Sequence, residues 1–312
     1  MNPFFGKQTV FILGAGASAP YGYPVGTAFK DDICLKFKSD IESLILSSGE
    51  SSTASAMSDL VDQTDEFIGS FQGSRINSID RWLSLNPRFG NIGKLAIVNS
   101  IVKCEHPDKL VFEGRDKSLD WFTVLFNKMI SGLSRPDQFQ YLQVPFITFN
   151  YDRLLEHLFY ESFRNTFTEL SAADIARMLS SLYIIHAYGA IDDPPWKKGR
   201  YIYGTDYTLK YLNAARGKIR IMDEGSGDNA IDRYLEEQIL QDAKRMFFLG
   251  FGYDADNLRI LGIPDRLKNN PQIFGTALGL LPEEIDRVRK MIGPQATIEG
   301  CDSTELLRKY LT

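Results

Sequence analysis

Short apolar runs alternate with helical patterns along most of this chain, and this alternation restricts the fold more than any other feature. The apolar runs lie at 9–13, 145–149, 182–189, 245–252, 271–278 and 295–300, and helical spacing fills 152–163, 230–243, 282–292 and 303–311. Strands that alternate with helices pair in parallel, and helices then bury both faces of the sheet. The sequence therefore predicts an α/β protein with a Rossmann-like, mainly parallel sheet covered by helices on both faces.

Two stretches interrupt this alternation. Residues 30–140 contain the helix-like segments 78–85 and 118–133, and also the polar, low-complexity stretch 47–59, for which we expect a loop or disorder. Residues 191–229 carry two adjacent prolines and several glycines, with one short extended piece at 200–204. We expect one domain over residues 1–312, with a mainly helical insertion at about 30–140 and a loop-rich insertion at about 191–229.

The composition argues against several classes of protein. A net charge of −5 gives no broad surface for nucleic acid. No apolar run approaches the roughly 20 residues that span a membrane, and the N-terminal residues lack the features of a secretion signal, so we expect a cytoplasmic protein. Cys34, Cys104 and Cys301 form no CxxC pair, which disfavours a disulfide framework and a four-cysteine zinc site.

The first apolar run leads directly into a glycine-rich turn and an expected helix. Gly14 and Gly16 allow close contacts that a Cβ atom would block, and the N–H groups of a following helix would point at a diphosphate. The spacing Gly14-x-Gly16-x-x-Ala19 fits the dinucleotide fingerprint. The acidic residue expected about 20 residues later is missing, since Asp31 and Asp32 lie in a helical pattern, and this disfavours a hydride-transfer dehydrogenase. A turn that only permits tight packing is the alternative.

Polar residues and glycines follow the carboxyl ends of the expected strands, where ligands bind in this class of fold. They are Gly14, Ala15, Gly16, Ser18, Asn150, Asp152, His186, Gly250 and Gly252. We expect these segments to converge on one cleft. Local alternatives stay open, with Asn150 as a turn residue, Asp152 as a helix cap and His186 as a core histidine. We expect His157 to be structural. We expect Tyr21 and Tyr23 in a surface loop, with packing over the ligand as the alternative.

Four motifs together resemble the sirtuin family. Residues 14–24, GAGASAPYGYP, resemble the sirtuin nucleotide motif, and residues 148–152, TFNYD, resemble its Thr-Gln-Asn-x-Asp motif with Phe149 in place of glutamine. Residues 184–189, IIHAYG, resemble the His-Gly motif with two residues inserted. Residues 247–258 and 273–280 resemble the late strands of a bacterial branch, the sirtuin-like NAD hydrolases of antiphage defence. The absence of zinc cysteines, and of the Asp-Phe-Arg of deacetylases at residues 25–27, favours this branch.

The resemblance implies an NAD+ glycohydrolase, which converts NAD+ and water to nicotinamide and ADP-ribose without a metal or zinc. Asn150 and His186 then take the catalytic roles: Asn150 holds a ribose hydroxyl and a water, and His186 accepts a proton. The implied NAD-binding residues are Gly14, Ala15, Gly16 and Ser18 along the phosphates, Asp152 at the nicotinamide amide, and Gly250, Gly252 and Asn257 near the ribose and adenine.

The same resemblance implies an antiphage-defence effector that depletes NAD when activated. We expect control by homo-oligomerisation, or by a partner such as an ATPase of the HerA type or another defence sensor, with no direct binding of nucleic acid or membrane. Two alternatives stay open. One is a module that binds NAD or ADP-ribose without cleaving it, and the other is an NAD-dependent deacylase, against which the missing zinc cysteines argue.

Overall fold

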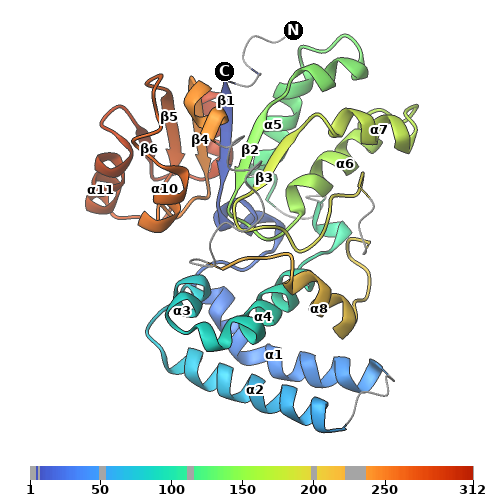
Figure 1. Cartoon of the computed structure of the whole chain (residues 1–312). Helices are drawn as coiled ribbons and strands as arrows, with labels where there is room; N and C mark the ends of the chain where they lie inside the picture. Colours follow the sequence, from blue (N-terminus) through green and yellow to red (C-terminus); the bar gives the residue numbers. More distant parts are fainter. Residues whose placement is uncertain are drawn as a thin grey trace.

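A parallel sheet forms the centre of the molecule. The computed structural model describes residues 5, 8–48, 54–110, 116–197, 202–221 and 237–311. Its six strands all run parallel in the order β3-β2-β1-β4-β5-β6 (Figure 1). Their bounds are Thr9–Leu13 for β1, Pro145–Thr148 for β2, Tyr183–His186 for β3, Arg245–Leu249 for β4, Gln272–Thr276 for β5 and Thr297–Glu299 for β6. The predicted Rossmann-like α/β fold is confirmed, and each strand lies within the apolar run that predicted it.

A row of aromatic rings sets the register of the central strands. Phe11 of β1 stacks on Phe146 of β2 and on Phe247 of β4, with ring centroids 5.3 and 5.2 Å apart. Phe247 stacks in turn on Phe274 of β5 at 5.2 Å. A shift of one residue would turn any of these rings to the opposite face of the sheet. The row therefore keeps the carboxyl ends of the four strands level, at the edge where the glycine turn and Asn150 lie.

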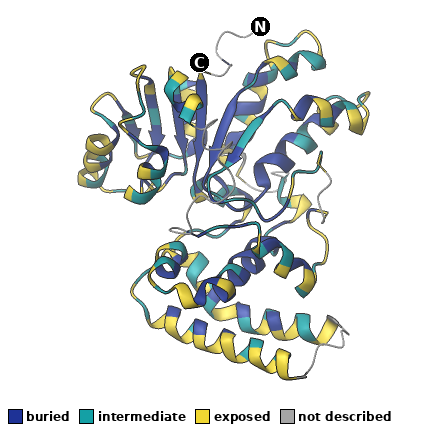
Figure 2. Ribbon diagram, viewed as in Figure 1, coloured by how far each residue is buried: buried dark blue, intermediate teal, exposed yellow. Residues whose placement is uncertain are grey.

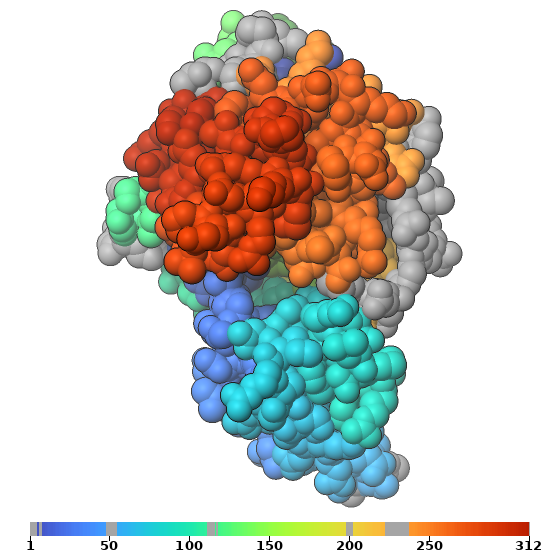
Figure 3. Space-filling model, turned by 90° about the vertical axis from the view of Figure 1, so that its left-hand side faces the viewer, coloured from blue at the N-terminus to red at the C-terminus, as the bar shows by residue number. Residues whose placement is uncertain are grey.

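Helices pack along the sheet and also form a separate group beyond its carboxyl edge (Figure 1). The first set comprises α5 (Trp121–Ile130), α6 (Leu154–Thr166), α7 (Ala172–Leu179), α10 (Ala255–Leu261), α11 (Pro282–Ile292) and α12 (Ser303–Tyr310). The second set, here called the helical unit, comprises α1 (Thr27–Ser48), α2 (Ala54–Gly73), α3 (Ile79–Leu85), α4 (Gly90–Val102) and α8 (Leu209–Arg216). In Figure 3 the helices α1 to α4 of this unit, blue to blue-green, project from the part of the molecule that holds the sheet.

The polar stretch 47–59 is not a loop where the structure describes it. Residues 54–59 belong to α2, and 47–48 end α1, whereas 49–53 lie outside the described residues. The reason lies further along α2, where Phe67 and Phe71 share one face and bury against Phe37 and Trp82. Packing of an apolar face stabilises a helix more than local propensity does. Figure 2 shows the opposite face of α2 exposed.

The loop-rich insertion expected at 191–229 contains one helix in its described part, α8. The Thr208 side chain accepts a hydrogen bond from the Tyr211 N–H at 3.2 Å and so caps the helix. Tyr211, Leu212 and Ala215 are buried where α8 packs on α4. The extended piece expected at 200–204 is a turn over 203–205, with 200–201 outside the described residues. Of the helix expected at 230–243, residues 237–242 are helical and 230–236 lie outside the described part.

Candidate functional site

The glycine turn after β1 interlocks with the turn after β4. Gly14 N–H donates to the Leu249 carbonyl at 3.0 Å, and Gly16 N–H donates to the Gly250 carbonyl at 2.9 Å. A Cβ atom on Gly14 would lie 2.6 Å from that Gly250 oxygen, and one on Gly250, where φ is +57°, would lie 2.0 Å from the Ala17 nitrogen. Only glycine fits at these positions. Tight packing, the alternative considered for this turn, therefore accounts for the glycines by itself, and phosphate binding stays a prediction.

The helix expected directly after the turn does not form there. Two short 3-10 turns, Ala15–Ala17 and Ala19–Tyr21, precede α1, which begins only at Thr27. Gly22, with φ of +89°, ends the second turn. Tyr21 and Tyr23 are buried rather than on a surface loop. The Tyr21 hydroxyl donates to the Asp120 carboxylate at 2.8 Å, which ties this segment to the start of α5.

A hydrogen-bond chain joins the ends of β1 and β2. The Asn150 Nδ2 group donates to the Gly14 carbonyl and to Ser18 Oγ, both at 3.0 Å. Ser18 Oγ donates in turn to Asp152 Oδ2 at 2.9 Å. Both amide protons of Asn150 are thereby used, and its Oδ1 atom has no hydrogen-bond partner within the described part of the chain. Asn150 is thus more than a turn residue, because its side chain holds two strand ends together and keeps one acceptor available.

Asp152 is buried and has two roles in the hydrogen bonding. Its Oδ1 atom accepts the Leu154 N–H at 3.1 Å at the start of α6, as the capping alternative expects, while Oδ2 accepts from Ser18. Burial raises the pKa of this carboxyl to about 6, although the two hydrogen bonds and the charge of His186 act in the opposite direction. Asp152 is therefore a carboxyl group whose ionisation falls near neutral pH, in contact with the Asn150 chain.

His186 is bonded at both ring nitrogens. Nδ1 lies 2.9 Å from the Asn150 carbonyl oxygen, which can only accept, so Nδ1 carries a proton. Nε2 lies 2.8 Å from Glu156 Oε1, and the two side chains are 11% and 5% exposed. Burial favours the neutral ring, but the Glu156 carboxylate and the two hydrogen bonds outweigh it and raise the pKa of His186. In this arrangement both ring nitrogens of His186 are engaged, and the raised pKa favours the imidazolium form.

The Glu156 carboxylate is a site residue that sequence reasoning missed. It lies on α6 one turn after Asp152, so both carboxylates face the end of the sheet. A glutamate in an amphipathic helix is usually solvent-exposed, whereas Glu156 is buried. The available signal was its spacing of four residues from Asp152 on a helix that starts at a strand end.

The cleft lies between the sheet edge and the helical unit, with a volume of about 230 Å³. From the sheet side it is lined by Ala15, Ser18, Tyr23, Asn150 and Asp152, and from the helical unit by Phe29 and residues 77–80. Behind it lies a cavity of about 10 Å³, lined by His186, Ser18, Asn150, Asp152 and Trp121 among others, which is roughly the space of one water. The cleft therefore brings together four predicted residues, and His186 lies behind them.

The remaining predicted residues lie outside the described lining of the cleft. Gly14, Gly16 and Gly250 form the interlocked turns, and Gly252 is exposed with open space around its Cα. Asn257 is on α10, where its Oδ1 accepts a hydrogen bond from the Tyr188 hydroxyl at 2.8 Å. These residues therefore lie at the carboxyl edge of the sheet without meeting Asn150 in one cavity.

A tyrosine connects the cleft to the helical unit. The Tyr151 hydroxyl contacts Asp80 Oδ1 on α3 and the Arg220 carbonyl oxygen at 2.8 Å. The phenol has a single proton and both neighbours are acceptors, so the Tyr151 hydroxyl shares that proton between Asp80 Oδ1 and the Arg220 carbonyl oxygen. Burial raises the pKa of Asp80, and the hydrogen bond with Tyr151 opposes that rise. Tyr151 therefore holds α3 against the end of β2, across the cleft.

The described part of the chain contains no group of three or more His, Cys, Asp and Glu side chains that could hold a metal ion. Within the same residues, no helix has the length and apolar character needed to cross a membrane.

No protein-family model matches the sequence, and no curated protein matches it.

Proposed function

We propose that this protein is an NAD+ glycohydrolase, which cleaves NAD+ with water to nicotinamide and ADP-ribose at the cleft between the sheet edge and the helical unit. The observation that carries the proposal is the chain from Asn150 through Ser18 to Asp152. It places an amide oxygen and a buried carboxyl group together at the carboxyl ends of parallel strands, where ligands bind in this class of fold.

The reaction needs positioning and charge stabilisation more than it needs acid catalysis. The nicotinamide–ribose bond breaks through an oxocarbenium-like state, and the leaving pyridinium departs as a neutral molecule without taking up a proton. Asn150 Oδ1 is available to accept from a ribose hydroxyl or from the attacking water. The Asp152 carboxylate, when ionised, stabilises positive charge that develops on the ribose. The Ser18 hydroxyl holds both groups in one orientation.

For His186 the geometry favours a positioning role over the expected role of proton acceptor. Its Nδ1–H holds the Asn150 carbonyl, and Glu156 occupies Nε2. A base needs a free lone pair, so His186 would have to lose a proton and its contact with Glu156 before it could accept one. We propose that the imidazolium fixes the backbone of Asn150 and adds positive charge beside Asp152.

A binding module for NAD or ADP-ribose is the second candidate. The cleft volume of about 230 Å³ is smaller than the roughly 300–1,000 Å³ of most ligand pockets. The packing of Gly14 and Gly16 against Gly250 also leaves little room beside the turn for phosphates. Both observations favour a protein that holds only part of NAD in this cleft. A deacylase has less support, since the chain lacks the cysteines of a zinc ribbon.

The resemblance to sirtuin-like defence proteins supports a cellular role as an effector that depletes NAD. In this proposal the protein acts in the cytoplasm as a homo-oligomer, or with a partner such as an ATPase of the HerA type. Purified protein should be incubated with NAD+, with and without co-purified partners, and both bound NAD and free nicotinamide should be measured by chromatography. Release of nicotinamide supports the enzyme, and bound but intact NAD in both states supports the binding module.

A further inference from the structure

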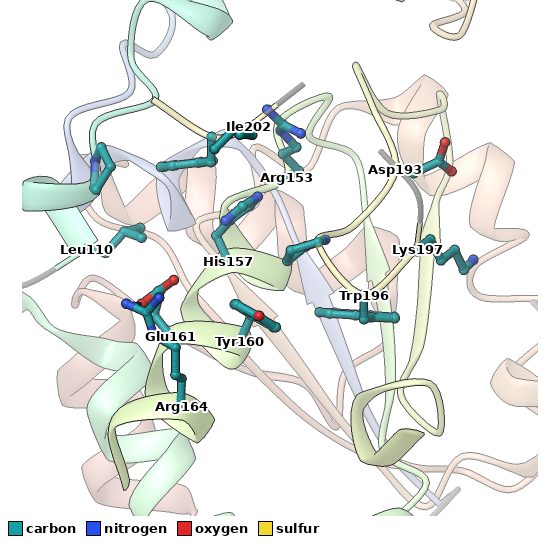
Figure 4. A pocket seen from close by; sticks show the side chains of 13 residues that line it. Leu110, Arg153, His157, Tyr160, Glu161, Arg164, Asp193, Trp196, Lys197 and Ile202 are labelled. Atoms are coloured by element: carbon teal, nitrogen blue, oxygen red, sulfur yellow. Dashed lines mark ion pairs between the residues drawn. The ribbon is translucent and has the colours of Figure 1, made fainter. Parts of the chain in front are cut away.

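A second and larger pocket lies beside α6, away from the cleft. Its volume is about 560 Å³, within the usual range for small-molecule sites. Side chains from α6, from the segment 193–197 and from residues 202–203 line it (Figure 4). None of its described lining residues takes part in the Asn150–Ser18–Asp152 chain. We call it the back pocket.

A buried histidine without a partner faces this pocket. His157 is 7% exposed and projects from α6 among the lining side chains (Figure 4). Its Nε2 atom has no hydrogen-bond partner in the described part of the chain. Burial and the nearby charge of Arg153 lower the pKa of His157 to about 3, so the ring is neutral and has one donor and one acceptor nitrogen. Buried polar atoms are nearly always paired, so an unpaired one beside a pocket requires a partner there, which a water or a polar group of a ligand can supply.

The walls of the back pocket are suited to a planar ring. The ring of Tyr203 packs against that of His157, with centroids 4.1 Å apart and an interplanar angle of 31°. Tyr160 and the half-buried Trp196 also line the pocket. Aromatic side chains bind nucleobases by stacking, and a polar edge group then determines orientation.

The positively charged side chains at the back pocket differ in how far their charge is already compensated by carboxylates. Arg153 is buried, and its Nε and Nη2 groups donate to Glu105 at 2.7 and 2.8 Å, so its charge is compensated. Arg164 is 58% exposed and contacts Glu161 through Nη2, which leaves further donors for a ligand. Lys197 is also exposed on the lining. Arginine and lysine side chains of this kind bind phosphate.

We propose that the back pocket binds a free mononucleotide, with the base against the aromatic side chains and the phosphate at Arg164. The edge of the base then pairs with His157 Nε2. The pocket is separated from the cleft by two tyrosines, because the Tyr203 hydroxyl lies 3.0 Å from the hydroxyl of Tyr23, which lines the cleft. The site does not depend on NAD cleavage.

The test uses AMP as the probe and isothermal titration calorimetry on the full chain. His157→Phe keeps the ring that packs on Tyr203 and removes both nitrogens, and Trp196→Ala removes a wall from a half-buried loop position. We expect each to weaken AMP binding at least tenfold while the thermal unfolding temperature changes little. Asn150→Ala, in the cleft, serves as the matched control and should bind AMP as the wild type does.

A second arm tests the phosphate contacts. Wild-type protein should bind AMP more tightly than adenosine, and Arg164→Gln should abolish that preference, whereas Lys197→Gln, on the opposite side of the pocket (Figure 4), should keep it. The proposal is overturned if AMP does not bind at millimolar concentration, or if His157→Phe and Trp196→Ala both bind AMP like the wild type. Loss of binding in Asn150→Ala alone would place AMP in the cleft and also overturn it. Equal binding of adenosine and AMP by the wild type would overturn the phosphate assignment.

Discussion

His186 Nε2 lies 2.8 Å from Glu156 Oε1, so the histidine expected to act as a base is paired with a buried carboxylate. The other ring nitrogen donates to the carbonyl of Asn150, the residue that begins the hydrogen-bond chain to Asp152. The pair therefore connects α6 and β3 to the backbone at the end of β2. His186 and Glu156 hold the backbone of Asn150 in place through their hydrogen bonds. Their replacement should therefore change stability as well as activity.

Replacing Glu156 with glutamine should lower the pKa of His186 and the free energy of unfolding. The loss should be about 1.5–3 kcal/mol, the usual contribution of a hydrogen bond to a charged group. Because the folded-state pKa of His186 is raised, this stabilisation is fully present below about pH 6.5, the ordinary value for histidine, and is lost as the pH rises through the folded-state pKa. Urea unfolding at pH 6 and pH 9 measures both effects.

The matched control for Glu156→Gln is Glu161→Gln, which changes a partly exposed carboxylate on the same helix, α6. It should unfold within about 0.5 kcal/mol of the wild type at both pH values. A difference between wild type and Glu156→Gln that stayed constant from pH 6 to pH 9 would mean that His186 does not carry the charge assigned to it.

Asp152→Asn should remove a pH dependence of stability. An acid whose pKa is raised from 3.8 to about 6 on folding holds its proton more tightly in the folded state. The contribution of Asp152 to the free energy of unfolding should therefore fall by about 3 kcal/mol as the pH rises from about 4 to about 6, and it appears as the difference between the wild type and the variant. Asparagine does not ionise, so the variant should lack this decrease, while the exposed Asp206→Asn should behave as the wild type does. Parallel stability curves for wild type and Asp152→Asn would contradict the assignment.

Gly250→Ala should destabilise the protein far more than Gly279→Ala. Both glycines have positive φ, +57° and +84°, so alanine costs about 1–2 kcal/mol of backbone strain at either position. Only at Gly250 does the added Cβ meet backbone atoms, at 2.0 Å from the Ala17 nitrogen, whereas nothing lies within 4 Å at Gly279. Thermal unfolding of the two variants isolates the steric effect. Similar losses in both would show that the two glycine turns do not interlock.

Tyr151→Phe should loosen the helical unit from the sheet. It leaves Asp80 and the Arg220 carbonyl without their shared partner, at a cost of about 1–3 kcal/mol. Hydrogen exchange should increase in α3 and at the end of β2. The control Tyr141→Phe alters a side chain that is 57% exposed and should change neither stability nor exchange. Unchanged protection of α3 in Tyr151→Phe would contradict the role given to this contact.

The sheet could be predicted because its central strands are buried on both faces and therefore appear as continuous apolar runs, as β1 does with five buried residues in a row. Elements that are stabilised by contacts with distant parts of the sequence could not be predicted. The polar start of α2 depends on Phe67 and Phe71, and α8 depends on burial against α4. Local propensity does not contain that information.

The candidate site, too, could be predicted from the sequence only in part. Asn150 and Asp152 stand directly after a strand, so their meeting with Ser18 followed from the rule for parallel sheets. Glu156 has its partner 30 residues away in sequence, and its burial follows only from the packing of α6 against β3. The burial of Tyr21 and Tyr23 depends likewise on α5 and on Tyr203.

The most direct test of NAD+ cleavage at Asn150 is to measure nicotinamide release from NAD+. The proteins compared are the wild type, Asn150→Ala and Asn213→Ala. Asn213 is an exposed asparagine on α8 and serves as the matched control. All three proteins should be shown to be folded, and assayed with the same co-purified partners. We expect nicotinamide release by the wild type and by Asn213→Ala. In Asn150→Ala the rate of release should fall by at least about 100-fold, the size expected when a preorganised polar group is removed. Release by Asn150→Ala at the wild-type rate, or no release by any of the three, would contradict the proposed cleavage at Asn150.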